Sequence, residues 1–498
     1  MTKRRSGAIL TRLHLSRESA VPVWRQLEDQ LRQVILSRQL PAGARLPSSR
    51  VLAGDLGVSR PTVVQVLERL EAEGLVEMRH GAGTFVAEAL PLEVAPPEAS
   101  DHEAGDLRPP RSSELGTRLL SLTADIEVHE HRSFLPNTPA YDHFPFAIWQ
   151  NCVSRQTRRA YRDNMGYAEP AGFEPLRRAI AGYLALHRGD GCDPEQVIIT
   201  PGAHAAFMIA AQLLTNPGDG LLFEDPGPFI ARHLFASLGR RLVHVPVDEE
   251  GMDFEAALAR DRQVRLAFVM PSRQHPLGRT LSLDRRLRLL DWARENEAWI
   301  LEDDYDSEFR YNGRPLPSMR SIDRDRRVIY VGTFSKALFP ALRIGYFVLP
   351  PGLVSMFRNA MALVFRSMPL ASQMALADFL GEGHFATHLR SMRDLYAERR
   401  GRFLAAAEQT GAGLLQAEIP DSGMNALVWL PAGLDDRAVA RRAVASDVHC
   451  YPLSDYCVSP FHSGLILGFT GVSEGQLLPG LRRLSDEINA LARAESDD

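Results

Sequence analysis

Cysteine is scarce in this sequence, with four among 498 residues, and no two of them form a Cys-x-x-Cys pair. So few thiols exclude a disulfide scaffold and are typical of a protein in a reducing cytoplasm. Long apolar runs are lacking too, since no stretch reaches the roughly 18 residues that suggest a membrane span. The N-terminal Met-Thr-Lys-Arg-Arg has no continuous apolar core behind it. We therefore expect neither a signal peptide nor a membrane partner.

What the sequence does have is length, ordinary hydrophobicity and an uneven distribution of charge. A chain of 498 residues, 45% of them hydrophobic, is expected to form two or more domains. Residues 1–87 contain 13 lysine and arginine residues against 8 aspartate and glutamate residues, although the whole chain has a formal net charge of −5. A basic head on an acidic body indicates that the head meets a polyanion.

Three zones can be separated along the chain. Residues 1–87, patterned from about residue 20, alternate short helical patterns with turn signals, and residues 88–118 are rich in Pro, Glu and Ser. The second zone cannot bury enough apolar surface to fold and is predicted to be a semi-extended linker. In residues 119–498, apolar runs such as QVIIT, GLLFED and RVIYVGT alternate with amphipathic helices. This alternation predicts an α/β domain with a mostly parallel sheet.

The head begins with a predicted amphipathic helix. Its apolar residues recur at steps of three and four: Val23, Leu27, Leu31, Val34 and Ile35. This spacing places them on one face of a helix.

Two more helices and a hairpin are predicted after it. Ser48 and Ser59 can cap the second and third helices, and Gly57 supplies the turn between them. LVEMRHGAGTFV has the pattern of strand, Gly-rich turn and strand, which predicts a wing. The head therefore has the layout of a winged helix–turn–helix, whose third helix enters the major groove by its N-terminal residues.

The segments LPSSR, LGVSRPTV, LEAEGL and GAGTFV resemble the GntR class of bacterial regulators across the whole head. The resemblance implies that the head binds double-stranded operator DNA. The contacts it implies lie near the third helix and on the wing: Arg50, Ser59, Arg60, Thr62, Arg79, His80 and Gly81, with Arg45 as a further candidate. Arginine and hydroxyl side chains at a helix start can reach phosphates and base edges. The alternatives are a winged helix that docks a protein and arginines that form a solvated face.

The sharpest chemical signal in the body is a lysine at the end of an apolar strand. Lys336 ends the run RVIYVGTFSK, and a lysine at the mouth of a buried strand is costly unless it is neutralised or bonded. Condensation with an aldehyde neutralises it, and lysine amines are the usual partners of pyridoxal phosphate (PLP). The alternative is a surface lysine.

Carboxylates end another apolar strand about thirty residues earlier, in AWILEDDYDSEFRY. Asp303 and Tyr305 lie two residues apart, so they share one face of a strand. An aspartate opposite the pyridine nitrogen of PLP keeps it protonated, and a tyrosine hydroxyl can bond the 3-oxygen of the ring. The alternative is that Asp303 and Asp304 cap a following turn.

From about residue 130 to its end the chain resembles fold-type I aminotransferases, and head and body together resemble the MocR branch of the GntR regulators. The resemblance implies that Lys336 forms the internal aldimine, that Asp303 pairs with the pyridinium and that Tyr305 bonds the 3-oxygen. It implies phosphate contacts from two segments: Thr333, Ser335 and Arg343, and Gly202, Ala203 and His204. Tyr167 matches a tyrosine that reaches the phosphate of the partner subunit, which implies a homodimer with shared sites. Tyr167 and His204 have plainer alternatives, as a packing residue and a helix-start surface residue.

Three segments depart from the aminotransferase pattern. Pro228 stands where relatives place an aromatic ring over PLP, and Phe229 is the nearest substitute. His275 replaces an asparagine that would help the 3-oxygen, and Arg273 replaces a histidine usual in the MocR branch. Ala203 lacks the hydroxyl that a serine or threonine would lend the phosphate. Lost phosphate and stacking contacts would each weaken cofactor binding by about 1 kcal/mol.

The segment HCYPLSDYCVSPFHSGLILGF contains no arginine, although amino-acid-handling relatives commonly bind the substrate carboxylate with an arginine there. It contains Ser454 and Asp455, and we expect a carboxylate there to repel the carboxylate of an amino acid. This argues against efficient transamination of common amino acids and fits an unusual or cationic effector, or PLP itself as the signal.

We therefore expect a cytoplasmic transcription regulator, associated with the nucleoid when bound to DNA, whose DNA binding responds to PLP or to its adduct with an amine or amino-acid effector. No metal site is expected. Two alternatives stay open: a working aminotransferase that carries a DNA-binding head, and a regulator whose body has lost PLP and serves as a dimerisation scaffold. A latent aminotransferase-like activity is compatible with the first expectation.

Overall fold

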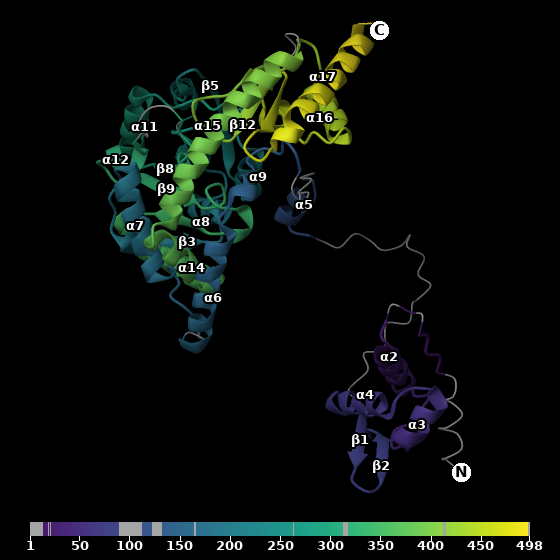
Figure 1. Cartoon of the computed structure of the whole chain (residues 1–498). Coiled ribbons are helices and arrows are strands. Elements are labelled where there is room, and N and C mark those ends of the chain that lie inside the picture. Colours follow the sequence, from purple (N-terminus) through teal and green to yellow (C-terminus); the bar gives the residue numbers. More distant parts are fainter. Residues whose placement is uncertain are drawn as a thin grey trace. The chain divides into compact units, whose positions relative to one another are not determined.

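The computed structural model describes residues 13–88 except Glu18 and Ala20, and residues 112–121, 132–163, 166–261, 263–311, 317–411 and 415–496. The chain divides into two compact units, the head (Met1–Arg111) and the body (Ser112–Asp498) (Figure 1). Among the helices in these ranges, none is both long and apolar enough to cross a membrane.

The stretch predicted as a linker, residues 88–118, is described only in part. Residues 89–111 lie outside the described ranges. Residues 114–118 are helical, as the beginning of α5 (Glu114–Ser121). The hydroxyl of Ser113 caps this helix by accepting a hydrogen bond from the backbone N–H of Gly116 at 3.1 Å. A helix therefore begins inside the predicted linker, because a single cap can start one even where the composition is polar.

The head is a winged helix–turn–helix, as predicted (Figure 1). Its elements are α2 (Val23–Leu36), α3 (Ser49–Leu56), α4 (Arg60–Ala72), β1 (Val76–Arg79) and β2 (Gly83–Val86). The hydroxyl of Ser48 accepts from the N–H of Val51 at 3.4 Å, and that of Ser59 accepts from the N–H of Thr62 at 3.3 Å. Gly57 ends α3 in the left-handed conformation, with φ of 64°. These three residues fix the turn from which α4 starts.

The core of the head joins α2 to α4. Its fully buried aliphatic side chains on these helices are Leu27, Leu31, Ile35, Val63, Val66, Leu67 and Leu70. Val23 and Val34, predicted on the same face of α2, are only half-buried at its margin. Each large aliphatic side chain that is fully buried contributes about 1.5–3 kcal/mol. The core holds α4 by its middle and end, and the first turn of α4 stays exposed.

The body is built around an eight-stranded sheet with the order β3-β10-β9-β8-β7-β4-β5-β6. Its strands are β3 (Val197–Thr200), β4 (Gly220–Asp225), β5 (Arg241–Asp248), β6 (Gly251–Met252), β7 (Val264–Val269), β8 (Trp299–Asp304), β9 (Val328–Thr333) and β10 (Gly345–Val348). The five strands from β9 to β5 are mutually parallel, whereas β10 and β6 run antiparallel to their neighbours. The predicted α/β fold with a mostly parallel sheet is confirmed. β10 is antiparallel because residues 334–344 are too short a connection for a crossover helix.

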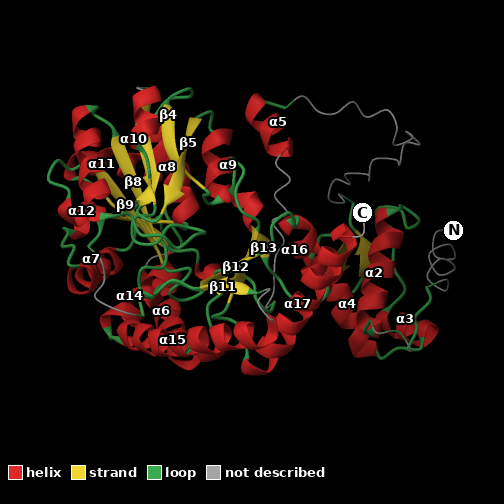
Figure 2. Cartoon of the chain, turned by 90° about the horizontal axis from the view of Figure 1, so that it is seen from above, coloured by secondary structure: helices red, strands yellow, loops and turns green. Residues whose placement is uncertain are grey.

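Helices cover both faces of this sheet (Figure 2). The helices of this part of the body are α6 (Phe146–Asp163), α7 (Glu174–Arg188), α8 (Ala203–Leu214), α9 (Phe229–Ser237), α10 (Glu255–Arg260), α11 (Leu283–Glu295), α12 (Met319–Ile322), α13 (Val354–Phe365) and α14 (Leu370–Gly381). Successive residues of β4 point to opposite faces: Phe223 packs with Phe235 of α9, and Leu222 packs with Leu289 of α11. A strand covered on both faces needs a continuous apolar run, and GLLFED has one.

A second, antiparallel sheet has the order β11-β12-β14-β13. It consists of β11 (Gln416–Glu418), β12 (Asn425–Trp429), β13 (Tyr451–Pro452) and β14 (Gly464–Gly468), and three helices accompany it in this part of the body: α15 (His384–Gly411), α16 (Asp436–Ala445) and α17 (Glu474–Ser496) (Figure 2).

Residues 133–138, near the start of the body, are attached to this small sheet and its neighbourhood. The carbonyl of Phe134 accepts from the N–H of Gly468 at 2.7 Å. The backbone N–H of Asn137 donates to Oδ1 of Asn425 at 2.7 Å, and the side-chain amides of the two asparagines bond at 2.9 Å. The hydroxyl of Thr470 donates to the Thr138 carbonyl at 2.6 Å.

Candidate functional site

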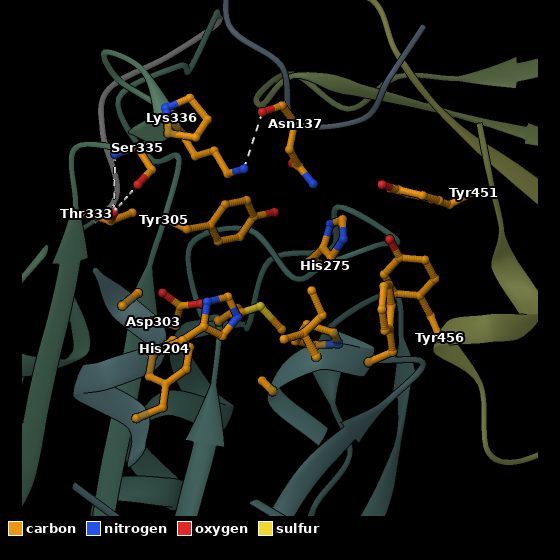
Figure 3. Close-up of a pocket in the computed structure, with 18 of the residues that line it drawn as sticks. Asn137, His204, His275, Asp303, Tyr305, Thr333, Ser335, Lys336, Tyr451 and Tyr456 are labelled. Atoms are coloured by element: carbon orange, nitrogen blue, oxygen red, sulfur yellow. Dashed lines mark hydrogen bonds between the residues drawn. The ribbon is translucent and has the colours of Figure 1, made fainter. Parts of the chain in front are cut away.

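A cavity of about 310 Å³ lies at the carboxyl ends of the parallel strands (Figure 3). This edge is where sheets of this kind bind ligands. Ten of the twelve residues predicted to contact the cofactor line it: Ala203, His204, Phe229, His275, Asp303, Tyr305, Thr333, Ser335, Lys336 and Arg343. Gly202 and Tyr167 are outside its lining. The structure thus brings most of the predicted residues together, and their individual roles stay predictions.

Lys336 follows the end of β9 and points into the cavity (Figure 3). Its Nζ donates to the backbone carbonyl oxygen of Asn137 at 3.3 Å. Burial lowers the pKa of Lys336 to about 8, although the carboxylates of Asp306 and Asp303 oppose the shift. A lowered pKa increases the fraction of uncharged amine, which is the nucleophilic form.

The composition of the chain gives a second indication that Lys336 is special, independent of any motif. Of its 57 lysine and arginine residues only two are lysines, Lys3 and Lys336. A chain in which arginine supplies nearly all positive charge has kept a lysine here. Arginine cannot replace lysine where an amine must lose its proton and react.

Asp303 and Asp304 have different surroundings. Oδ1 of Asp303 is buried without a hydrogen-bond partner among the described residues. Desolvation, followed by the charge of Asp304, raises the pKa of Asp303 well above its usual value. The carboxylate of Asp304 is already engaged by Arg188 at 2.7 Å and by the hydroxyl of Tyr330 at 2.6 Å. An unpaired buried acceptor costs about 1–3 kcal/mol, so Asp303 is the carboxylate that a ligand with a hydrogen-bond donor would satisfy.

Tyr305 is positioned by Arg273, which in the sequence stands out only as a departure from the pattern of the MocR branch. Nη1 of Arg273 donates to the hydroxyl oxygen of Tyr305 at 2.9 Å and lies 2.9 Å from Oδ2 of Asp306. Nε of Arg273 donates to the carbonyl of Ser422 at 3.1 Å. Because the Tyr305 oxygen already accepts a hydrogen bond, its own O–H is available as a donor toward the cavity.

We expect Arg273→Met to lower the free energy of unfolding by roughly 3–5 kcal/mol, because it leaves the buried charge of Asp306 unpaired. Urea denaturation of the full chain measures the loss, and a second change, Asp306→Asn, should restore most of it. Arg279→Met is the matched control, since Arg279 is more exposed and pairs with Glu249 and Glu418. Equal losses for Arg273→Met and Arg279→Met would contradict a special role for Arg273.

One end of the cavity has the features of an anion site. α8 begins at Ala203, and the first N–H groups of a helix have no partners within it. The Thr333 and Ser335 hydroxyls lie 3.2 Å apart beside this helix start (Figure 3). Burial, Arg343 and Lys336 lower the pKa of His204 to about 4, so its imidazole is neutral at pH 7.

Gly202 makes room for Arg343 at this end. Gly202 has φ of 90°, and a Cβ built on it would lie 3.1 Å from the guanidinium carbon of Arg343. Nη2 of Arg343 donates to the carbonyl of Pro201 at 3.1 Å. A side chain at position 202 would therefore be strained and would crowd the arginine.

The opposite wall of the cavity is aromatic. The ring of Phe229 packs edge-on against Tyr456 at 5.3 Å and lies 6.4 Å from Tyr451. His275 contacts the rings of Tyr305 and Tyr456, and its Nδ1 is buried without a partner among the described residues. Pro228 lines the cavity next to Phe229, and stacking by Phe229 on a cofactor stays a prediction.

Three polar residues of the lining were missed from the sequence: Asn137, Tyr451 and Tyr456. Asn137 has no motif around it and reaches the cavity through its attachment to the small sheet. The two tyrosines lie in the segment where an arginine was sought. Their presence was visible, but nothing in their spacing separates a cavity tyrosine from a core one.

The prediction that Asp455 would repel a ligand carboxylate is wrong. Asp455 is not in the cavity lining. Its carboxylate faces away and pairs with Nε of Arg437 at 2.7 Å. Ser454 is likewise turned away, and its hydroxyl bonds Asp436 at 2.5 Å. The turn at residues 453–456 sends these two side chains outward and Tyr456 inward, an alternation that the sequence alone does not settle.

Tyr167 lies on the surface of its own chain, with 76% of its area exposed. The guanidinium of Arg366 lies 4.4 Å from its ring centre. It therefore does not serve the cavity of its own subunit, and the predicted contact with a partner's site stays a prediction.

The predicted DNA-contacting residues of the head are mostly exposed. Arg50, Ser59 and Arg60 are exposed and Thr62 is half-buried, around the start of α4. Nε of Arg60 donates to the hydroxyl of Ser49 at 3.4 Å. This contact joins α3 to α4 and leaves most of the guanidinium free to meet another partner.

The wing presents its arginines on an aromatic ring. The guanidinium groups of Arg79 and Arg45 lie 4.9 Å and 5.9 Å from the centre of the Phe85 ring. Arg79 also pairs with Glu77 at 2.9 Å, which offsets part of its charge. Gly81, beside the exposed His80, allows the tight turn with φ of 74°.

Comparison with known families places a match on each unit. Residues 24–86 match the family of bacterial regulatory proteins of gntR type, and residues 137–458 match the family of class I and II aminotransferases. The chain is 41% identical over 480 residues to the probable rhizopine catabolism regulatory protein MocR of Rhizobium meliloti, with 96% of each chain covered. It is 29% identical to the pyridoxine biosynthesis transcriptional regulator PdxR of Corynebacterium glutamicum, over 93% of this chain and 95% of PdxR.

The body is also similar to solved aminotransferases. The α-aminoadipate aminotransferase LysN of Thermus thermophilus, complexed with N-(5'-phosphopyridoxyl)-L-leucine, is 27% identical, with a TM-score of 0.70. That likeness covers 77% of this chain and 98% of LysN. The kynurenine aminotransferase of Pyrococcus horikoshii is 28% identical with a TM-score of 0.67, over 76% of this chain and 95% of that one.

Proposed function

Since this chain belongs to the MocR branch of the GntR family of transcription regulators, we propose that it binds operator DNA through its head and changes that binding when PLP in its body meets an amine. One observation carries the proposal. The same chain holds an exposed recognition-helix start and a cavity lined by Lys336, with a lowered pKa, and by Asp303, whose Oδ1 has no hydrogen-bond partner among the described residues.

The cofactor of the body is PLP, and the residues present fit it. The orphaned Oδ1 of Asp303 would accept a hydrogen bond from the protonated pyridine nitrogen. Tyr305, held by Arg273, would donate its O–H to the 3-oxygen. The ring of His275 lies beside that of Tyr305. When bound, PLP supplies an aldehyde that condenses reversibly with amines. Lys336 would hold the cofactor through its amine.

The anion end of the cavity would hold the phosphate of PLP. The side chains of Arg343, Thr333 and Ser335 face it, and the helix start at Gly202, Ala203 and His204 offers backbone N–H groups. Ala203 adds no hydroxyl, so the helix start relies on its backbone there. With a neutral His204, the charge at this end comes from Arg343.

A homodimer would join two heads to two half-sites of an operator. The exposed Tyr167 of each chain would then reach the phosphate in the partner's cavity. An amine that competes with Lys336 for the cofactor would favour one geometry of the dimer over another, and so alter how the two heads meet DNA. Such a regulator works in the cytoplasm and joins the nucleoid while it is bound to DNA.

A second candidate is a working aminotransferase with a DNA-binding head. It is favoured by the cavity itself, which has the lysine, aspartate and tyrosine of the aminotransferase pattern. A turnover assay over a panel of amines and keto acids separates the two, because a regulator would complete few or no cycles.

A footprint on the DNA upstream of the gene tests the proposal. The full chain is expected to protect two half-sites, and PLP together with an active amine is expected to shift its affinity by about 1–3 kcal/mol, or roughly 5- to 150-fold. An unchanged footprint and affinity under every combination of PLP and amine would refute the coupling. Failure to protect any upstream sequence would refute the role of the head.

A further inference from the structure

The wall across the cavity from Lys336 carries hydrogen-bonding groups, and no cationic side chain lines it among the residues that the structure describes. Tyr451 and Tyr456 face the cavity from the C-terminal part of the chain, with His275 beside them (Figure 3). Burial, Arg273 and Lys336 lower the pKa of His275 to about 3, and desolvation raises the pKa of Tyr456 well above its usual value. His275 and Tyr456 are therefore neutral at pH 7.

Three arginines next to this wall have other partners. Arg273 lies behind Tyr305 and is paired with Asp306. Arg232 donates to the carbonyl oxygens of Asp455 and Tyr456 at 2.8 Å and 2.9 Å.

Arg437, the third, pairs with the outward-facing carboxylate of Asp455. None of these three guanidinium groups lines the cavity. These arginines hold the wall in place, but none of them presents its guanidinium to the cavity.

Two cations do line the cavity within the described part of the chain, Lys336 and Arg343. Arg343 lies at the anion end, beside Gly202 and the start of α8, and Lys336 is the group that a ligand amine displaces. A carboxylate on the ligand would thus be desolvated without a cationic partner, which is unfavourable.

The wall nevertheless has hydrogen-bonding groups that favour a polar ligand. The Nδ1 atom of His275 is buried without a hydrogen-bond partner among the described residues, and only 8% of His275 is exposed. The phenol groups of Tyr451 and Tyr456 add donors and acceptors nearby. Ligand hydroxyls can bond all of these groups, because a hydroxyl both donates and accepts.

We infer that the effector is a primary amine without a carboxylate, which presents neutral hydroxyl groups to Tyr451, Tyr456 and His275. The inference rests on the proposed function and adds to it the chemical class of the signal. The inferred effector lacks the carboxylate that the substrates of amino-acid aminotransferases carry, and a carboxylate is the group that this wall does not bind.

Ethanolamine and serine form a matched pair of probes, because they differ only by the carboxylate. The PLP-loaded full-length protein is titrated with each, and the change in its visible absorbance gives the concentration of half-maximal effect. Ethanolamine is expected to act at a concentration at least about tenfold lower than serine, equivalent to about 1.4 kcal/mol. Propylamine, in which a methyl group replaces the hydroxyl, is expected to be weaker than ethanolamine.

Equal or stronger action by serine would overturn the inference, and so would a protein that responds to neither amine. Equal action by propylamine would overturn its hydroxyl part. If the protein stays colourless when PLP is supplied, the proposed function fails and this inference fails with it. If it is coloured but prefers serine, only this inference fails.

A charge added to the wall provides a second, independent test. Tyr451→Arg is expected to bring serine to an equal or lower half-maximal concentration than ethanolamine. Phe461→Arg adds the same charge at a position that is 42% exposed and outside the cavity lining, and it should keep the preference for ethanolamine. A Tyr451→Arg protein that still prefers ethanolamine as strongly as the Phe461→Arg protein would overturn the inference.

Discussion

Lys336→Ala is expected to abolish the visible absorbance of the PLP-loaded protein and its response to amines, while DNA binding by the head remains. The covalent partner of the cofactor is lost, and the remaining contacts are hydrogen bonds and one ion pair. Retention of PLP is therefore expected to fall by about 100-fold or more, since each 1.4 kcal/mol is tenfold. Absorbance after dialysis measures the retention, and a gel shift measures DNA binding.

The rarity of lysine makes a direct control possible. Borohydride fixes a lysine–PLP linkage, and Lys3 is the only other lysine of the chain. Peptide mass spectrometry of the reduced protein should find the cofactor on Lys336, and Lys3→Arg should leave both colour and label unchanged. A label on Lys3, or an unchanged spectrum in Lys336→Ala, would contradict the assignment of the cofactor to this cavity.

Arg60→Ala is expected to weaken operator binding by about 1–3 kcal/mol, or roughly 5- to 150-fold. Arg60 is the first residue of α4, it is exposed, and its Nε donates to the neutral hydroxyl of Ser49. Its guanidinium is therefore available for a phosphate or a base edge. Titration of a labelled upstream fragment in a gel shift gives the change.

Arg25→Ala is the matched control, since Arg25 is also exposed but lies on α2, away from the start of α4 in the sequence. Its effect is expected to stay within a few-fold at the same salt concentration. The dependence of affinity on salt separates two roles: a phosphate contact reduces the slope and weakens all sequences alike, whereas a base contact changes sequence preference. Similar losses for Arg25→Ala and Arg60→Ala would argue against a specific role for α4.

The fold of the head could be predicted from its sequence because local signals agreed with one another. Ser48, Gly57 and Ser59 each have side chains or conformations that set a helix boundary within three or four residues. The strands of the body were equally visible, because strands buried on both faces require continuous apolar runs. The start of α5 was not visible, since one cap in a polar stretch does not stand out.

The site could be predicted most directly where chemistry follows from a strand end. Lys336, Asp303 and Tyr305 each lie at such an end, so topology alone brings them together. The roles of Arg273 and Asn137 could not be predicted from the sequence, because they depend on contacts with distant segments. Arg273 contacts Tyr305, and Asn137 contacts Asn425.

The error at Asp455 has a related cause. Which way a side chain points in a short turn depends on the partners around it, in this case Arg437. The segment does form a wall of the cavity, but Asp455 lies on the side that faces away from it.

The attachment of residues 133–138 to the small sheet bears on how the state of the cofactor lysine can be passed on within the body. The carbonyl of Asn137 receives the hydrogen bond of Lys336, and Asn137 is bonded to Asn425 of β12 through its backbone N–H and its side-chain amide. One backbone carbonyl therefore couples the chemical state of the lysine to the strand that opens the small sheet's core.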